Sequence, residues 1–155
     1  MRSEAYSSPE LTAAQAMYGE INERALEVEA AKRLPADLAV KLNDTGILRM
    51  AIPKAYGGTE RTLGQLLRAN EAVSYADGSV GWVSLIYSTM GFISGLMPAH
   101  WAKEIFNQQK MTISCGATAP SGRGEFVKGG VKASGRWAFG SGAHNSDWIA
   151  GGTLV

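Results

Sequence analysis

Apolar positions recur every three or four residues along the first part of the chain, a spacing that predicts amphipathic helices. From Pro9 the spacing continues to Val28, so we expect one helix there. Its buried face would consist of Leu11, Ala14, Met17, Ile21, Ala25 and Val28. A second, short helix is expected from Pro35 to Gly46, because proline suits a first helical turn and glycine a C-terminal cap.

Polar capping residues predict where the next helices begin. Thr62 and Gln65 have the spacing of a capping box, so a third helix should run from there to about Tyr75. Its expected buried residues are Leu63, Leu66, Leu67 and Val73. Asp77 can cap the following helix, which is apolar nearly all round and is therefore expected in the middle of a bundle. A last short helix is expected over residues 98–106.

The pattern changes at Met111, where short apolar runs alternate with Gly, Pro and Ser turns. These runs predict strands over residues 112–118, 124–127, 131–139 and 148–155. We therefore predict an α+β chain: an all-α domain over residues 1–110, followed by the start of an antiparallel, barrel-like β domain over residues 111–155. The β region is too small to stand alone and must pack against the helices.

Composition narrows the functional classes. The 155 residues are 45% hydrophobic, and 15 Lys and Arg nearly balance 14 Asp and Glu, so neither nucleic acid nor an anionic membrane surface is an expected partner. Glycines and serines interrupt the longest apolar stretch, Val80 to Met97, which is read as a buried helix rather than a membrane span. Cys115 is the single cysteine and is expected to be a small buried residue, consistent with a cytoplasmic location. With His100 and His144 as the only histidines, no metal site is expected.

The stretch from Lys132 to Trp148 carries the candidate chemistry. It places two indole rings, a phenylalanine and several hydroxyl side chains among three glycines, which allow close backbone approach. This composition suits a wall against a flat aromatic ligand, although glycine-rich aromatic strands also occur in ordinary sheets.

Within this stretch, residues 134–142 read Ser-Gly-Arg-Trp-Ala-Phe-Gly-Ser-Gly, and Asp147-Trp148 follows. Two further motifs lie upstream, Asp-Gly-Ser-Val-Gly-Trp at residues 77–82 and Ala-Pro-Ser-Gly-Arg-Gly at residues 119–124. Together these motifs resemble proteins of the acyl-CoA dehydrogenase fold, and most closely the oxygenases of two-component flavin-dependent monooxygenases. The resemblance covers most of the chain.

The resemblance implies a role for each matching residue. Thr118 and Pro120 would meet the pyrimidine edge of the flavin, although Ala119 stands where the family usually has an acidic residue. Trp137 and Phe139 would belong to the flavin site, with Phe139 against the isoalloxazine ring. Ser141 would lie near flavin N5 and act in catalysis, which suits a site short of water.

The resemblance also implies that the helix after Asp77 forms a wall of the substrate cavity. Trp82, Tyr87 and Ser88 are therefore candidate substrate-binding residues, with plain core packing as the alternative. His144 is shifted by one place from the position of the family's histidine, so no role is assigned to it.

Three functions follow from the sequence. The first is the amino-terminal part of a monooxygenase oxygenase component, which would hydroxylate a small aromatic substrate with reduced FMN or FAD supplied by a separate reductase. The second is an acyl-CoA dehydrogenase-like oxidoreductase, and the third is an inactive interaction fragment. The chain ends within an apolar strand, so we expect the family's remaining strands and C-terminal helical bundle to be absent. The family's full-length proteins imply a homo-oligomer, a tetramer.

Overall fold

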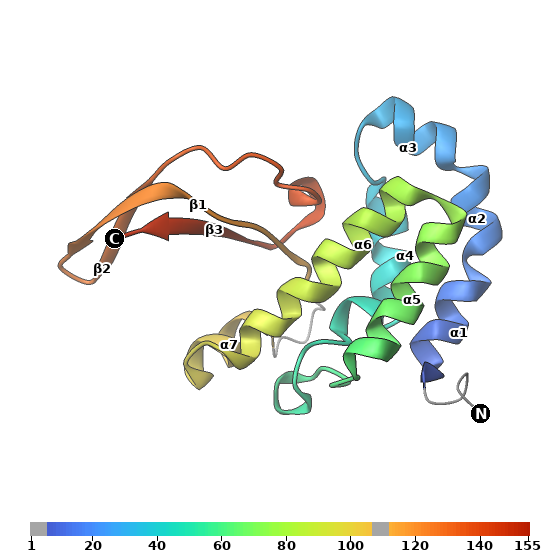
Figure 1. Cartoon of the computed structure of the whole chain (residues 1–155), viewed down its shortest axis with the longest axis horizontal. Helices are drawn as coiled ribbons and strands as arrows, with labels where there is room; N and C mark the ends of the chain where they lie inside the picture. The colour runs from blue at the N-terminus through green and yellow to red at the C-terminus, as the bar shows by residue number, and fades with distance from the viewer. Residues whose placement is uncertain (1–5, 107–111) are drawn as a thin grey trace.

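The computed structural model describes residues 6–106 and 112–155, in which helices precede a three-stranded sheet (Figure 1). The α-helices are α1 (Pro9–Ala16), α2 (Tyr18–Glu23), α3 (Ala25–Ala31), α4 (Ala36–Asp44), α5 (Leu63–Ala76), α6 (Gly78–Met90) and α7 (Ala99–Phe106). The predicted order, a helical domain followed by a β region, is confirmed. The predicted boundary between residues 110 and 111 lies outside the described residues.

The stretch predicted as one helix from Pro9 to Val28 forms the three helices α1, α2 and α3. The helix tightens at Met17 and at Arg24, where each backbone amide donates to a carbonyl only three residues back. The predicted apolar face nevertheless exists, because Ala14, Ile21 and Val28 are all buried in the core. The periodicity therefore identified the buried face and missed the two breaks.

Capping bonds form as predicted. Thr62 and Gln65 make both bonds of the capping box that opens α5, and the Asp77 carboxylate accepts from Val80 N at 2.8 Å to open α6. One part of the prediction for α5 is wrong: Leu63 and Leu67 are 69% and 49% exposed. Leu63 lines a pocket together with Phe92 and Leu96, which are also exposed.

Helices α5 and α6 pack closely through small and polar residues. A Cβ on Gly81 would lie within 2.6 Å of Ser74 Cβ, so only glycine permits this approach. Deeper in the interface, the Ser84 hydroxyl donates to Asn70 Oδ1 at 2.9 Å. Both side chains are buried, and this bond satisfies polar groups that would otherwise be costly in the core.

Arg49 connects the turn after α4 to the end of α7. It belongs to the 3-10 helix η2 (Ile47–Arg49) and is 8% exposed. Its guanidinium donates to the carbonyls of Tyr56, Gly57 and Phe106 at 2.9 to 3.0 Å. Burial lowers the pKa of Arg49 from its ordinary value. The turn at residues 56–58, which follows the 3-10 helix η3 (Lys54–Tyr56), is therefore held from inside the bundle.

The sheet has the strand order β2-β1-β3, with β1 (Ser114–Val127), β2 (Gly130–Ser134) and β3 (Trp148–Leu154). β2 pairs antiparallel to β1 as predicted, whereas β3 pairs parallel to β1. Residues 135–147 carry the chain back to the start of β1, so β3 runs in the same direction. The strand predicted to reach Phe139 ends at Ser134, and the first two predicted strands form one strand, β1.

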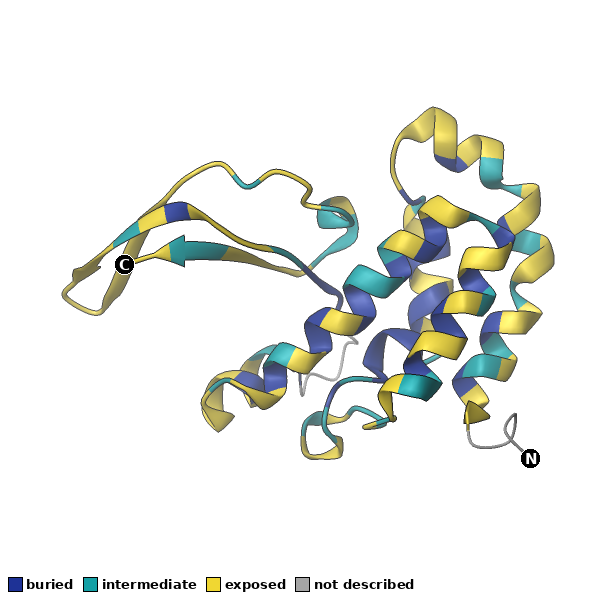
Figure 2. Cartoon of the chain, in the orientation of Figure 1, coloured by how far each residue is buried: buried dark blue, intermediate teal, exposed yellow. Residues whose placement is uncertain are grey.

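Burial is concentrated in the bundle, and the sheet extends away from it with most of its surface exposed (Figure 2). Cys115 is an exception, because it is fully buried as predicted where β1 meets α6. In the part of the chain that the structure describes, no helix is long and apolar enough to cross a membrane.

Candidate functional site

The Ser141 turn, defined as residues 139–147, returns from the sheet to the helical bundle (Figure 1). Phe139 opens it with a φ of 59° and a side chain that is 92% exposed. Gly142, with a φ of 85°, leads into the short 3-10 helix η5 (Ala143–Asn145). A positive φ is costly for a phenylalanine, and strained backbone of this kind is often found at functional sites.

Three side-chain hydrogen bonds anchor this turn to the bundle. Trp82 Nε1 donates to Ser141 Oγ at 3.1 Å, and the Tyr87 hydroxyl donates to the Gly142 carbonyl at 2.8 Å. Asn145 Nδ2 donates to the Leu34 carbonyl, between α3 and α4, at 2.8 Å. The structure thus brings Ser141 and Trp82, which are distant in sequence, into direct contact.

The hydrogen bond from Trp82 determines which further hydrogen bonds the Ser141 hydroxyl can make. An indole N–H is a donor only, so Ser141 Oγ is the acceptor in this bond. The Ser141 proton is then free to donate to a further acceptor. Ser141 is half-buried and Phe139 points outward, so an acceptor on a ligand can reach this side of the turn.

Asp147 fixes the other end of the turn to the first strand. Its backbone amide donates to the Ile113 carbonyl at 2.8 Å, and its carboxylate accepts from Ile113 N at 3.0 Å. These bonds set the parallel register that begins with Ser114 opposite Trp148. The Asp-Trp pair of the sequence motif therefore has a clear structural role.

Trp137 packs across glycines of the sheet. Its indole lies where a Cβ on Gly151 would come within 2.9 Å of Cε2, and its Nε1 donates to the Gly152 carbonyl at 2.6 Å. Glycines at these positions leave the strand surface flat enough for the ring. In this structure Trp137 supports the irregular segment between β2 and the Ser141 turn, and its flavin role stays a prediction.

Thr118 and Pro120 lie in the part of β1 where its pairing with β3 is irregular, between Ala117 and Gly122. Both residues are exposed. The chain passes so close to Gly152 that a Cβ there would lie 2.5 Å from the Ala119 carbonyl oxygen. The bulged strand leaves the Thr118 side chain accessible, as a flavin contact requires, and that contact stays a prediction.

The three candidate substrate-binding residues have different surroundings. Trp82 is 55% exposed, whereas Tyr87 is 2% exposed and Ser88 is fully buried. The Ser88 hydroxyl donates to the Ser84 carbonyl at 2.7 Å and lies 3.2 Å from the Ile47 carbonyl, which are contacts of a core residue. The burial and backbone bonds of Ser88 favour the packing alternative, and a substrate role for it stays a prediction.

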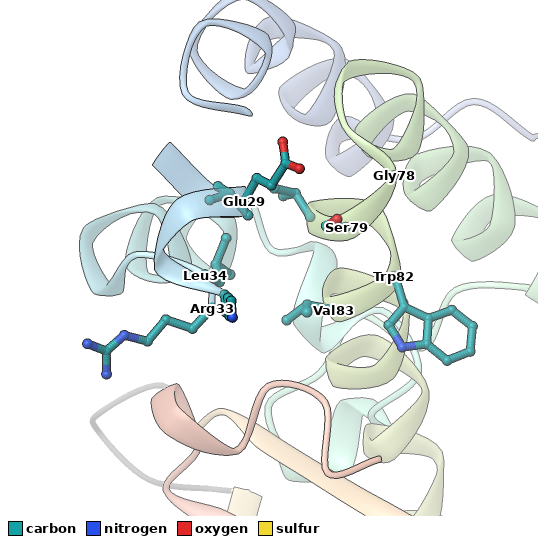
Figure 3. A pocket seen from close by; sticks show the side chains of 10 residues that line it. Glu29, Arg33, Leu34, Gly78, Ser79, Trp82 and Val83 are labelled. Atoms are coloured by element: carbon teal, nitrogen blue, oxygen red, sulfur yellow. The ribbon is translucent and has the colours of Figure 1, made fainter. Parts of the chain in front are cut away.

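A pocket of about 510 Å³ lies between the first turns of α6 and the end of α3 (Figure 3). Leu34 and Val83 line its apolar part, while Arg33 and the Trp82 indole point away from it. Trp82 is the only predicted site residue among its lining residues, and both Trp82 and Leu34 also hydrogen-bond the Ser141 turn. Within residues 6–106 and 112–155 no group of three or more His, Cys, Asp or Glu could hold a metal ion.

Burial raises the pKa of the Tyr87 hydroxyl to about 12. Because the folded-state pKa exceeds the unfolded value of about 10, the protonated Tyr87 hydroxyl makes its full contribution to stability below pH 10. This contribution is lost as the pH rises towards 12. We expect the free energy of unfolding to fall by about 1 kcal/mol more in the parent chain than in Tyr87→Phe between pH 9 and 11. Urea titrations at a series of pH values measure this difference. If the free energy of unfolding depends on pH in the same way in both proteins, the raised pKa of Tyr87 is contradicted.

Sequence reasoning missed Gly142 and Asn145 as site residues. Asn145 contacts Leu34, 111 residues away, and nothing in the local sequence indicates that partner. The positive φ of Gly142 is typical of glycine, but the sequence holds 19 glycines and does not single it out. Gly142 acts through its own carbonyl, and the Asn145 side chain bonds the carbonyl of Leu34; a backbone carbonyl carries no sequence signal.

Comparison with known families gives one match over most of the bundle. Residues 10–104 match the family model described as "Acyl-CoA dehydrogenase, N-terminal domain". The match covers α1 to α7 nearly completely and ends before the sheet.

Curated relatives and solved structures extend the similarity into the sheet. The chain is 32% identical, over 80% of its length, to an "FADH(2)-dependent resorcinol hydroxylase, oxygenase component" from a Rhizobium strain. It is 29% identical, over 87% of its length, to the "Flavin-dependent monooxygenase, oxygenase subunit HsaA" of Rhodococcus jostii. A crystal structure of 3-HSA hydroxylase from a Rhodococcus species superposes on 95% of the chain with a TM-score of 0.90 at 28% identity. The chain spans 30% and 36% of those two relatives and 39% of that structure.

Proposed function

This chain belongs to the acyl-CoA dehydrogenase N-terminal domain family, and from that membership we propose that it forms part of the oxygenase component of a flavin-dependent monooxygenase. The bond between Trp82 and Ser141 carries the proposal, because it joins the family's helical domain to the predicted flavin turn. The names of the relatives, which are hydroxylases and monooxygenase subunits, support the same activity.

The residues beside Ser141 fit a flavin chemically. The exposed Phe139 ring offers an apolar face for a flat tricycle, and the Ser141 hydroxyl retains a proton for a ring nitrogen. Thr118, accessible on the bulged part of β1, would meet the polar edge of the ring. A bound reduced flavin would supply the reaction of oxygen with substrate. The chain's own residues would orient the ring, hold a hydrogen bond at N5 and exclude water.

The relatives also suggest the wider setting. The term "oxygenase component" in the name of one relative implies a separate reductase that delivers reduced flavin, and its FADH(2) dependence favours FAD over FMN. Resorcinol and indole-3-acetate appear in the names of relatives, so a small aromatic compound is the proposed substrate class. The homotetramer implied by the resemblance stays a prediction.

An acyl-CoA dehydrogenase-like activity is the second candidate, and the name of the matching family favours it. Bound oxidised flavin separates the two activities. Anaerobic addition of an acyl-CoA should leave its absorbance unchanged if the chain belongs to an oxygenase. Bleaching of the flavin by the thioester would instead support the dehydrogenase.

Flavin binding tests the proposal directly. We expect the chain to bind reduced FAD with a Kd on the order of 10 μM, measured by anaerobic titration, with FMN as comparison. Ser141→Ala and Phe139→Ala should each weaken binding at least about fivefold, equivalent to about 1 kcal/mol. Phe126 is 83% exposed at the far end of β1, so Phe126→Ala is the matched control and should bind normally. Absence of binding by the parent chain would favour the inactive-fragment interpretation.

A further inference from the structure

We propose that Tyr87 is a positioning residue for Ser141: its hydroxyl ties the Ser141 turn to α6 and so keeps Ser141 within reach of Trp82. The catalytic role of Ser141 in this inference rests on the proposed function. The positioning of Ser141 by Tyr87 rests on the contacts alone. The family resemblance implies a substrate-binding role for Tyr87, with core packing as the alternative. Its contacts instead direct its hydroxyl to the backbone beside the proposed catalytic serine.

The Gly142 carbonyl is the point where these contacts converge. It accepts from the Tyr87 hydroxyl at 2.8 Å, from Ser146 Oγ at 3.1 Å and from Asn145 N at 3.1 Å. Two of the three donors belong to the turn itself and would hold its internal shape. Tyr87 is the donor that comes from α6, so it connects that shape to the bundle.

The packing around Tyr87 makes this connection close. Its side chain is 2% exposed, and a Cβ on Gly142 would lie within 2.8 Å of the Tyr87 hydroxyl and nearer still to its ring. The ring therefore sets how closely the turn approaches α6. Ser141 precedes Gly142 directly, so the position of its hydroxyl follows from this contact.

Trp82 reports the position of Ser141 without any ligand. Trp82 lies on the same helix as Tyr87, five residues earlier, and its indole N–H donates to Ser141 Oγ at 3.1 Å. Loss of the Tyr87 hydroxyl leaves the Gly142 carbonyl with its two local donors only. Asn145 and Asp147 still hold the end of the turn, but its part at Ser141 and Gly142 can then move away from α6, and the Trp82 bond should lengthen or break.

The test measures the chemical shift of the Trp82 indole N–H proton in the 155-residue chain and in its variants, each labelled with 15N-tryptophan. The Trp82→Phe variant lacks this resonance and so assigns it. Ser141→Ala removes the acceptor and defines the resonance of the unbonded indole. In Tyr87→Phe, which keeps the ring and its packing, we expect the resonance to move at least halfway from its parent position to that of Ser141→Ala. Tyr75 is 84% exposed on α5, so Tyr75→Phe should leave the resonance in place.

A role for Tyr87 in stability alone would lower the melting temperature but leave this resonance unchanged, because the resonance reports folded molecules. An unchanged resonance in Tyr87→Phe therefore overturns the inference. The measurement needs no flavin, so failure of the chain to bind flavin would count against the proposed function and not against the positioning role. If the parent chain binds FAD, Tyr87→Phe should also weaken that binding at least threefold.

Discussion

Replacement of Gly142 by alanine is expected to lower the free energy of unfolding by about 3 kcal/mol. A φ of 85° is readily adopted by glycine and is strained for alanine. The added methyl group would also meet the ring of the buried Tyr87, which cannot move without disturbing the core around α6. Both costs act at the residue that links the Ser141 turn to the helices. Chemical denaturation measures the loss.

Gly140, two residues earlier, provides the matched control. Its φ is not positive, and a Cβ there would meet only the Ala143 Cβ at 3.9 Å, which is ordinary contact. Gly140→Ala should therefore change the free energy of unfolding by no more than about 0.5 kcal/mol. Equal effects of the two substitutions would show that the turn is not docked as described.

Replacement of Arg49 by methionine should cost about 3 kcal/mol of unfolding free energy. Methionine preserves much of the apolar contact but leaves the carbonyls of Tyr56, Gly57 and Phe106 without the guanidinium donor. Phe106 is the last residue of α7, where the helix dipole favours a cation. Part of the loss is offset because the variant no longer buries a charge. Urea titration at neutral pH provides the measurement.

Arg68 is the control for this change. It lies on α5 with a side chain 54% exposed and pairs with Glu71 on the same helix face. Surface pairs of this kind contribute little, so Arg68→Met should cost less than about 0.5 kcal/mol. A loss for Arg49→Met no larger than that of Arg68→Met would contradict the anchoring role given to Arg49.

The helices were the most predictable part of the fold, because their signals are local. Thr62 and Gln65, three residues apart, make the predicted capping box, and Asp77 caps α6 through its neighbour Val80. The breaks at Met17 and Arg24 were not predictable, because neither residue is a helix breaker. They arise from a tightening of the helix that the apolar periodicity tolerates.

The sheet was less predictable, because its pairing depends on distant contacts. The antiparallel pairing of β2 with β1 follows from the tight turn at Lys128-Gly129, which short-range patterns indicate. The parallel pairing of β3 depends instead on the path of the Ser141 turn, which Tyr87 and Asn145 fix from the bundle. No local sequence pattern specifies such a path.

Resemblance to a family contributed more to the candidate site than periodicity did. It selected Ser141 and Phe139 from a stretch whose composition alone also fitted an ordinary sheet. It also selected Tyr87 and Ser88 together, although the two neighbours differ in the structure. Tyr87 reaches the Ser141 turn, whereas Ser88 bonds carbonyls within the helical core. Adjacent helical positions point in different directions, and only coordinates separate them.

The parallel placement of β3 beside β1 also affects how fast the chain can fold. The bond from Asn145 to Leu34 closes a loop of 111 residues, and β3 follows directly after it in the chain. Closing so long a loop costs conformational entropy, and the contacts of β3 can offset that cost only after the loop has closed. The rate of refolding should therefore be limited by the assembly of the third strand, while the helices, which depend on neighbours in sequence, form early.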